Sequence, residues 1–487
     1  TLGVCAGEHN VFAGWQSPYK VAMQIMDENG AHELLDYWPY DNIRSANEIM
    51  KILEEATFDQ ETIAQKIAEA RFLRAFMYFE LVKRYGGVPL ITEPQNIDQP
   101  AEELNVPRDP EADIYDFIAA EMDAITDILP ASYSSDEFGK PTKWAALALK
   151  SRAMLYAASI AEFSTITLPE GVVGIAQSAT TGYWQAAYDA SMEIINNSPH
   201  ALYEANPDPQ DNYAEIFTND GNNEVIFAEV YDFGLLKTHS WNLYNMPDGF
   251  RTGWGSNGPV YLEHVEKYEY MDGSSGKLDW ADLEDNVLFD IETLMHHKDP
   301  RFRASVFYPE TPWQDGVVYF HKNTIGTIDP GDTWPTKAPK RNYVKSGFLT
   351  RKRVNESIKL PFSNEDETDF IVFRLGEMYL NAAEAAFHID GMDAEALSLI
   401  NDIRARAGMP PKPDISLDVI RNERAVELAF EEHRYWDLRR WRTAVAELNG
   451  MGFHGVSWTY DYPQKKYTLK LIDADYNQIR TFLDKNY

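Results

Sequence analysis

The chain has 487 residues, with 77 acidic against 44 basic side chains and a formal net charge of −33. This excess of acid argues against a nucleic-acid-binding protein, which needs a basic surface to neutralise phosphates. Apolar residues make up 44% of the chain and aromatic residues 13%, enough for a large core, which argues against a disordered protein. The sequence holds no apolar run of about 18 residues, so it predicts no membrane-spanning helix.

Helical periodicity dominates the amino-terminal part of the chain. It predicts one helix pair that ends at the Gly86-Gly87 cap, a second pair rich in alanine, and a single further helix. Small residues at helix contacts are typical of stacked helical repeats, although no strict period is visible. The expected helices cover about 40–56, 62–84, 113–129, 142–163 and 184–196.

Between residues 197 and 369 the pattern becomes irregular. Glycine, proline, asparagine, aspartate and aromatic residues multiply there, with short β-like runs such as Val225–Val230 and Val317–Phe320 among them. Loops this long in a compact protein usually carry function. We therefore expect this region to hold the binding residues.

Helical patterns return near the carboxyl end, at 370–388 and 394–407. The last predicted helix is long, covers about 417–448 and begins after the N-cap Ser416. Its segment 421–441 places many charges among bulky apolar residues, which is not the pattern of a surface helix. We expect this helix to be partly buried.

Three glutamates of that segment recur every four residues, so they stack on one helix face: Glu423, Glu427 and Glu431. Such a column of like charges repels itself unless cations intervene. Arginines near a carboxylate favour its charged form, whereas a glycosidase needs one protonated carboxyl. The pattern therefore predicts a structural charge network and not a hydrolytic site. The expected cations are Arg421, Arg424 and Arg434.

The sequence contains no recognisable catalytic constellation. No nucleophile-elbow, Walker or dinucleotide-binding motif stands out. His296 and His297 are adjacent, so on a helix their side chains point apart, and no matched third metal ligand is evident. The single cysteine, Cys5, excludes an internal disulfide framework. We expect no catalytic residues, no metal ion and no cofactor.

Several segments in the same order resemble the signatures of the SusD/RagB family, the outer-membrane nutrient-binding lipoproteins of Bacteroidetes. The first, AEARFLRAFMYFELVKRYGGVPLI, covers Ala68–Ile91, and the last, ERAVELAFEEHRYWDLRRW, ends at Trp441. The others are Val106–Arg108, Lys140–Tyr156, Pro259–Gly273, Lys298–Phe302, Phe373–Phe387 and Ile400–Gly408.

The resemblance implies a mainly α, SusD-like fold. Four TPR-like helix pairs would form a scaffold, joined to an irregular, loop-rich ligand-binding region with short β-strands. Residues 1–487 would form a single SusD-like domain. Its expected portions are an N-terminal helical-repeat portion at 40–196, an irregular ligand-binding portion at 197–369 and a C-terminal helical portion at 370–448.

The same resemblance implies a non-catalytic function at the cell surface. The protein would bind oligosaccharide or polysaccharide and deliver it to a SusC-like TonB-dependent transporter of the outer membrane, which its helical side would contact. It would be a surface-exposed lipoprotein, attached to the outer membrane by an N-terminal lipid anchor that is not visible in this chain. The RagB branch leaves a peptide-binding uptake lipoprotein open as the alternative. An enzyme is the third hypothesis.

Sugar binding requires aromatic planes for the C–H faces of the ring, beside amide, carboxylate or guanidinium groups for its hydroxyls. The irregular region and the amino end supply that mixture. Tryptophans inside helical patterns are expected in the core instead, namely Trp144, Trp184, Trp436 and Trp441. The predicted ligand-binding residues are Trp15, Arg251, Trp254, Asn257, Trp313, Tyr319 and Trp334.

Overall fold

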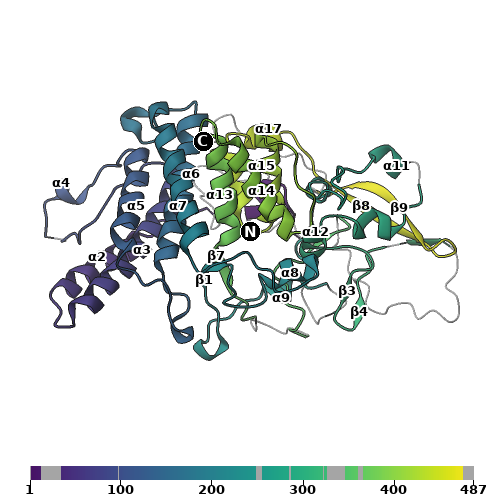
Figure 1. Cartoon of the computed structure of the whole chain (residues 1–487), viewed down its shortest axis with the longest axis horizontal. Coiled ribbons are helices and arrows are strands. Elements are labelled where there is room, and N and C mark those ends of the chain that lie inside the picture. Colours follow the sequence, from purple (N-terminus) through teal and green to yellow (C-terminus); the bar gives the residue numbers. More distant parts are fainter. Residues whose placement is uncertain are drawn as a thin grey trace.

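The computed structural model describes most of the chain and is mainly helical, as predicted. The molecule is elongated, with the amino-terminal helices at one end and a carboxy-terminal β-hairpin at the other (Figure 1). None of the described helices combines the length and the hydropathy that crossing a bilayer requires. The described residues are 2–11, 35–96, 98–247, 250, 255–284, 287–321, 323–325, 346–359 and 366–474.

The long helices form a stack in which each helix packs against the next (Figure 1). The stack crosses a large gap in the sequence, because α13 packs on α7 although the irregular region separates them. This arrangement confirms the prediction of a scaffold of stacked helices. Its members are α2 (Tyr40–Glu54), α3 (Gln60–Tyr85), α5 (Glu111–Thr126), α6 (Lys143–Phe163), α7 (Thr180–Asn197), α13 (Leu375–Phe387) and α14 (Asp393–Arg406).

Local sequence explains where these helices begin and what they bury. The N-cap Asp59 of α3 accepts a hydrogen bond from the Thr62 amide at 2.8 Å. Gly86 ends that helix with a φ of 71°, as the glycine pair predicts. Helix α6 is buried on nearly all sides because it packs between α5 and α7. The four tryptophans expected in the core are at most 7% exposed.

The strands are short and correct two predictions. Strand β1 (Val225–Glu229) pairs antiparallel with β7 (Phe370–Arg374). Residues 370–374 were expected to open a helix, but they complete this β-pair, and α13 begins only after Arg374. The predicted run 317–320 is reduced to the two-residue β4 (Gly316–Val317), which pairs with β3 (Pro312–Trp313).

The carboxy-terminal hairpin forms the end opposite the helical stack (Figure 1). Its strands β8 (His454–Asp461) and β9 (Lys466–Asp473) pair in register, and β5 (Asn323–Ile325) adds to β8 in parallel. The sequence patterns predict no helix or strand for this hairpin. A further pair joins β2 (Val306–Phe307) to β6 (Leu349–Thr350).

Short helical segments connect these elements. The α-helical ones are α4 (Ala101–Leu104), α8 (Pro209–Glu215), α9 (Trp241–Asn245), α10 (Leu262–Val265), α11 (Trp280–Glu284) and α12 (Pro300–Ser305). Single turns of 3₁₀-helix lie at Leu2–Ala6, Ser135–Glu137, Pro169–Gly171, Gln177–Ala179 and Phe233–Leu235. A π-helical turn covers Glu292–His296. The segment 2–11 is buried, and its Cys5 is 2% exposed.

The prediction of one long helix over 417–448 is wrong. Three helices replace it: α15 (Leu417–Glu427), α16 (His433–Arg440) and α17 (Ala444–Leu448). The N-cap Ser416 is confirmed, since its hydroxyl accepts from the Val419 amide at 3.2 Å. The first break contains two left-handed residues, Phe430 and Glu432, with φ of 61° and 69°. This reversal brings Asp437 of α16 back to Arg424 of α15, at 3.2 Å.

The expected network of buried charges exists, but the expected arginines do not pair with its glutamates. Glu427 is fully buried and binds Arg374 at 2.7 Å and Arg301 at 2.9 Å, and it also binds Arg406. These partners come from three other elements: β7, α12 and α14. Glu423 binds Arg301 and Arg404, and Glu431 binds Arg374 and Lys352. Of the expected cations, Arg424 pairs with Asp437 and Arg434 with Glu447.

The network keeps Glu427 and Glu431 ionised. Burial alone would raise the pKa of Glu427, but Arg406, Arg374 and Arg301 hold it well below its ordinary value. Arg374 and Lys352 likewise lower the pKa of Glu431 against the effect of burial. A general acid must hold a proton near neutral pH. These glutamates therefore have a structural role.

Candidate functional site

The structure describes three of the seven predicted binding residues. Trp15, Arg251, Trp254 and Trp334 lie outside the described residues. Asn257 lines a cavity of about 650 Å³. Trp313 belongs to the core, with 1% exposure and its ring 4.9 Å edge-on from Phe307. Tyr319 is half-buried and lies 5.5 Å from the ring of His321. The structure therefore places one of the three at the cavity and the other two elsewhere.

The cavity that contains Asn257 combines aromatic and polar walls, and we call it the aromatic cavity. Its aromatic side chains are Tyr231, Trp241, Tyr244 and Phe370. Amide and hydroxyl side chains that can bind a ligand by hydrogen bonds are Ser240, Asn245, Asn257, Thr350 and Thr368. Its charged or titratable groups are His9, His239, Arg353, Asp369 and Glu432.

Helix α9 positions one aromatic wall. Trp241 is its first residue, and the indole Nε1 donates to the backbone oxygen of Lys352 at 3.1 Å. Tyr244 follows on the same helix and is 42% exposed. The backbone N–H of Asn257 donates to the backbone oxygen of Tyr244 at 2.9 Å, which fixes Asn257 beside α9. An aromatic pair and a primary amide thus share one wall.

Other lining residues come from the ends of the β1–β7 pair. Tyr231 lies just beyond β1, and its amide donates to Oδ1 of Asp369 at 2.8 Å. The ring of Tyr231 packs edge-on against the ring of His239, with the two centroids 4.6 Å apart. Phe370, which follows Asp369, pairs in register with Glu229. Burial raises the pKa of Asp369 to about 6. The sheet therefore determines the separation between Tyr231 and Phe370.

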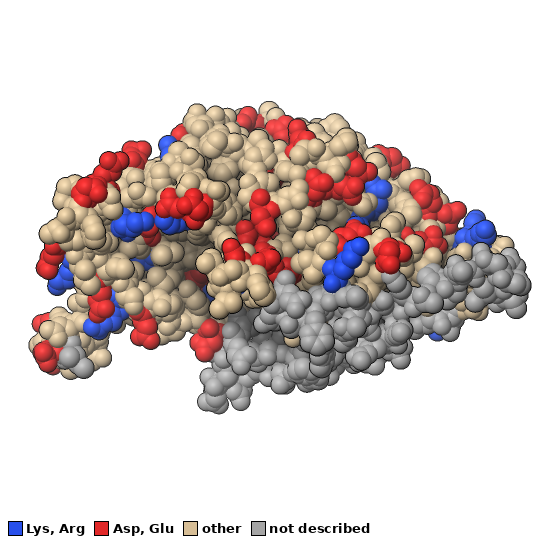
Figure 2. Space-filling model, turned by 90° about the horizontal axis from the view of Figure 1, so that it is seen from below, with Lys and Arg blue, Asp and Glu red and all other residues tan. Residues whose placement is uncertain are grey.

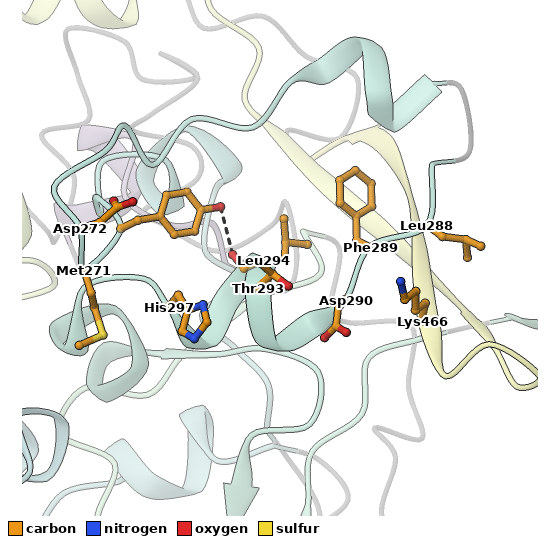
Figure 3. Close-up of a pocket in the computed structure, with 10 residues that line it drawn as sticks. Met271, Asp272, Leu288, Phe289, Asp290, Thr293, Leu294, His297 and Lys466 are labelled. Atoms are coloured by element: carbon orange, nitrogen blue, oxygen red, sulfur yellow. Dashed lines mark hydrogen bonds between the residues drawn. The ribbon is translucent and has the colours of Figure 1, made fainter.

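A second cavity of about 700 Å³ lies toward the carboxy-terminal hairpin (Figure 3). Its carboxylates serve local turns, since Asp272 accepts from the Ser274 amide at 2.8 Å and Asp290 from the Glu292 amide at 3.0 Å. Its apolar side chains include Met271, Leu288 and Phe289, on different sides of the cavity (Figure 3). This cavity offers fewer amide and hydroxyl side chains beside its aromatic surface, so the aromatic cavity is the better candidate site.

The described residues contain no cluster of three or more His, Cys, Asp or Glu side chains arranged to hold a metal ion. A third cavity of about 270 Å³ lies beside Trp313 and is lined by Arg351, Asp211 and Glu356 among others. Its aromatic side chains, Tyr213, Phe217 and Trp313, are at most 3% exposed, so they offer little surface to a sugar face.

Comparison with known proteins identifies the family. A model of the SusD family matches residues 223–487, and a model described as "starch-binding associating with outer membrane" matches residues 5–155. A SusD-like protein from Bacteroides ovatus is 25% identical over 452 residues, which cover 89% of this chain and 70% of the relative.

Solved structures share the fold over nearly the whole chain. A SusD-like protein from Bacteroides fragilis superposes with a TM-score of 0.76 at 24% identity, covering 99% of this chain and 89% of that chain. A laminarin-binding SusD-like protein superposes with a TM-score of 0.63 at 21% identity, covering 91% and 86%. The family model alone spans more than half of the sequence, and the chain belongs to the SusD family.

Proposed function

We propose that this protein binds oligosaccharide or polysaccharide in the aromatic cavity and does not cleave it. The observation that carries the proposal is the single wall formed by Trp241, Tyr244 and Asn257. A pyranose ring packs its C–H face on an aromatic plane while amides bind its hydroxyls. Laminarin binding by a protein of the same fold supports the assignment.

The carboxylates of the cavity support binding without hydrolysis. Asp369 and Glu432 both line it, and each accepts a backbone amide, from Tyr231 and Leu2 respectively. These contacts give both carboxylates a role in holding the local backbone, which favours binding without hydrolysis. Incubation with polysaccharides should release no reducing ends. Their appearance, and their loss in an Asp369→Asn variant, would establish an enzyme instead.

We also propose that the protein is a surface-exposed lipoprotein of the cell outer membrane that delivers glycan to a SusC-like TonB-dependent transporter. Family membership supports this, because one matching model describes proteins that associate with the outer membrane. Affinity capture of the tagged protein from native outer membranes should retain a TonB-dependent transporter. Capture without any such transporter would contradict the delivery step and leave glycan binding untouched.

Glycan binding can be tested with Trp241→Ala and a matched tryptophan control. Retardation in native gels that contain a panel of neutral and acidic polysaccharides measures binding. The wild-type protein should be retarded by at least one of them, and Trp241→Ala should weaken this binding by about tenfold or more, since stacked aromatic residues dominate such sites. Trp38→Ala is the control, because Trp38 is 54% exposed on the helical end and does not line the cavity.

The same experiment separates the glycan from the alternative ligand. If no polysaccharide retards the wild-type protein, or if Trp38→Ala weakens retardation as much as Trp241→Ala does, the proposal fails. Peptides that co-purify with the wild-type protein, identified by mass spectrometry, would then favour the peptide-binding function.

A further inference from the structure

Arg353 occupies an unusual position in the aromatic cavity. Its guanidinium carbon lies 4.2 Å from the centroid of the Trp241 ring and 4.9 Å from that of Phe370. The backbone at Arg353 is left-handed, with a φ of 64°, which a non-glycine residue adopts only at a cost. The preceding Lys352 points into the buried charge network, where it binds Glu431 at 2.7 Å. Arg353 lines the aromatic cavity instead and, unlike Arg351, borders both this cavity and the third one.

The hydrogen-bonding capacity of this guanidinium is unused. A guanidinium carries five N–H donors. No described residue accepts a hydrogen bond or forms an ion pair with Arg353, and its Nε is buried without a partner. The aromatic rings contact the guanidinium, so the amino nitrogens at its end remain as donors toward the cavity.

The buried arginines show how this molecule normally compensates such a charge. Arg301 and Arg374 each bind three carboxylates and Arg440 binds two, with ion pairs of 2.5 to 2.9 Å. These carboxylates raise the pKa of Arg374 well above its ordinary value. Burial lowers the pKa of Arg353, and more distant carboxylates, with Glu432 foremost, offset this only in part. Arg353 is therefore a half-buried cation without a bound counter-ion among the described residues.

The carboxylates that act electrostatically on Arg353 already have other donors. Glu431 binds Lys352 and Arg374. Glu432 accepts from the Leu2 amide at 2.6 Å. Asp366 accepts from the amides of Asn242 and Thr368, both at 3.0 Å. None of them lies within ion-pair distance of Arg353 among the described residues, so the structure supplies the guanidinium with an aromatic frame but no anion.

We propose that the aromatic cavity selects glycans that carry an acidic group, a carboxylate or a sulfate ester, and that Arg353 binds this group through its amino nitrogens. The inference rests on the proposed glycan binding and adds the chemical class of the ligand. Both anions present two oxygens that match the planar guanidinium fork. A neutral hydroxyl accepts one hydrogen bond but leaves the half-buried charge uncompensated.

The net negative charge of the protein repels anionic ligands. Binding of an acidic glycan therefore depends on the local contact with Arg353. Acidic side chains are spread over the face seen in Figure 2, with fewer basic ones among them. With a net charge of −33, general electrostatics would repel a polyanion. A preference for acidic glycans at about 150 mM salt, where long-range fields are screened beyond about 8 Å, therefore reports a specific contact.

Paired glycans that differ in charge provide the test. Titration calorimetry of the full chain would compare polygalacturonate with its methyl ester, and dextran sulfate with dextran. The wild-type protein should bind the acidic member of one pair at least about tenfold more tightly, and the identity of the pair separates carboxylate from sulfate. Arg353→Met should abolish this preference, and Arg353→Lys, which keeps the charge but loses the fork, should retain part of it.

Arg351→Met is the matched control. Arg351 also lies near two aromatic rings, those of Phe307 and Trp313 at 5.7 and 5.5 Å, but it lines the third cavity. The Arg351→Met variant should keep the preference for acidic glycans. Melting temperatures check that each variant is folded. If Arg353→Met is unfolded, Arg353→Lys decides the question.

The outcomes distinguish this inference from the function on which it rests. Equal affinity for both members of each pair overturns the inference, as does a preference that persists in Arg353→Met or disappears in Arg351→Met. In these cases glycan binding still stands if Trp241→Ala abolishes it. If the wild-type protein binds no glycan of either charge, both the proposed function and the inference fail.

Discussion

Two buried glutamates show how strongly neighbouring arginines change the pKa of a carboxyl group. Glu8 is fully buried, and its Oε1 accepts from the Phe430 amide at 3.0 Å, while Oε2 has no hydrogen-bond partner in the part of the chain that the structure describes. Burial raises its pKa to about 7. Glu384 is equally buried, but Arg440 and Arg424 lower its pKa to about 2. The difference follows from the arginines, because burial alone acts in the same direction on both.

Replacing Glu8 with glutamine should change how stability depends on pH. The pKa of about 7 in the folded state lies above the ordinary value of 4.5. The contribution of protonated Glu8 to the free energy of unfolding is therefore fully present below pH 4.5. It is lost as the pH rises to about 7. Because glutamine does not ionise, Glu8→Gln should be more stable than wild type at pH 8 by on the order of 2–3 kcal/mol, and no more stable at pH 4.5.

Urea unfolding at pH 4.5, 6 and 8 measures this difference. Glu384→Gln serves as the comparison, since it removes a paired charge and should destabilise the protein near neutral pH. A Glu8→Gln variant whose offset from wild type is the same at pH 4.5 and pH 8 would contradict the assigned pKa.

At the level of the element, tight turns decide how the helices dock. Gly86 ends α3 with a φ of 71°, and a Cβ at this position would lie 2.5 Å from the backbone oxygen of Val172. The amide of Gly87 donates to that same oxygen at 2.7 Å. The end of α3 is therefore packed against the loop before α7, and glycine is needed for space as well as for conformation.

Two glycine substitutions separate these requirements. Gly391 also has a positive φ, of 80°, but a Cβ there would meet nothing within 4 Å. Gly391→Ala should cost about 1–2 kcal/mol for the left-handed backbone alone. Gly86→Ala should cost clearly more, because the backbone oxygen of Val172 must also move. Thermal or urea unfolding of both variants measures the difference, and equal losses would show that crowding at Gly86 has no effect.

Across the whole molecule, the buried charge network joins the helical stack to the irregular region. Glu427 of α15 binds arginines of α12, β7 and α14, which are distant in sequence but adjacent in the centre of the molecule (Figure 1). Such a network stabilises only while it is complete, because a buried charge that loses its partner is strongly unfavourable. The network is expected to make these elements unfold together.

Hydrogen exchange of a Glu427→Gln variant tests this connection. Removing the carboxylate charge leaves three arginines undercompensated, and loss of a buried pair costs about 3–5 kcal/mol. Amide exchange should accelerate in α12, α14 and α15 together, while α2 at the far end of the stack remains unchanged. Faster exchange confined to α15, or equal acceleration in α2, would contradict the expectation of a shared cooperative unit.

Much of the fold could be predicted because it depends on local patterns. The helices at 40–54 and 143–163 follow from periodicity, and Asp59, Gly86 and Ser416 act as the caps that their types predict. The strand at 370–374 could not be predicted in this way. Its apolar run fits a helix equally well, and only pairing with β1 decides between the two.

The candidate site was only partly accessible to prediction. Asn257 is a predicted binding residue, and it lines the aromatic cavity. Tyr231 and Phe370 also line it, but the sequence does not single them out, because they border strands that pair across the irregular region. Trp241 carried a signal, an aromatic residue in a loop-rich context, but so did Trp313, which is buried. Composition identifies residue types suited to sugar binding and does not tell which of them face the same space.

The sequence by itself determined the family, the helical scaffold and the existence of a buried charge network, because motifs, periodicity and four-residue spacing are properties of neighbouring residues. Only the tertiary structure decided which arginines neutralise Glu423 and Glu427, and that the predicted long helix breaks at Phe430. It also decided that Arg353 lies against two aromatic rings and has no counter-ion among the described residues. These contacts join segments far apart in the chain, so they depend on how the elements pack.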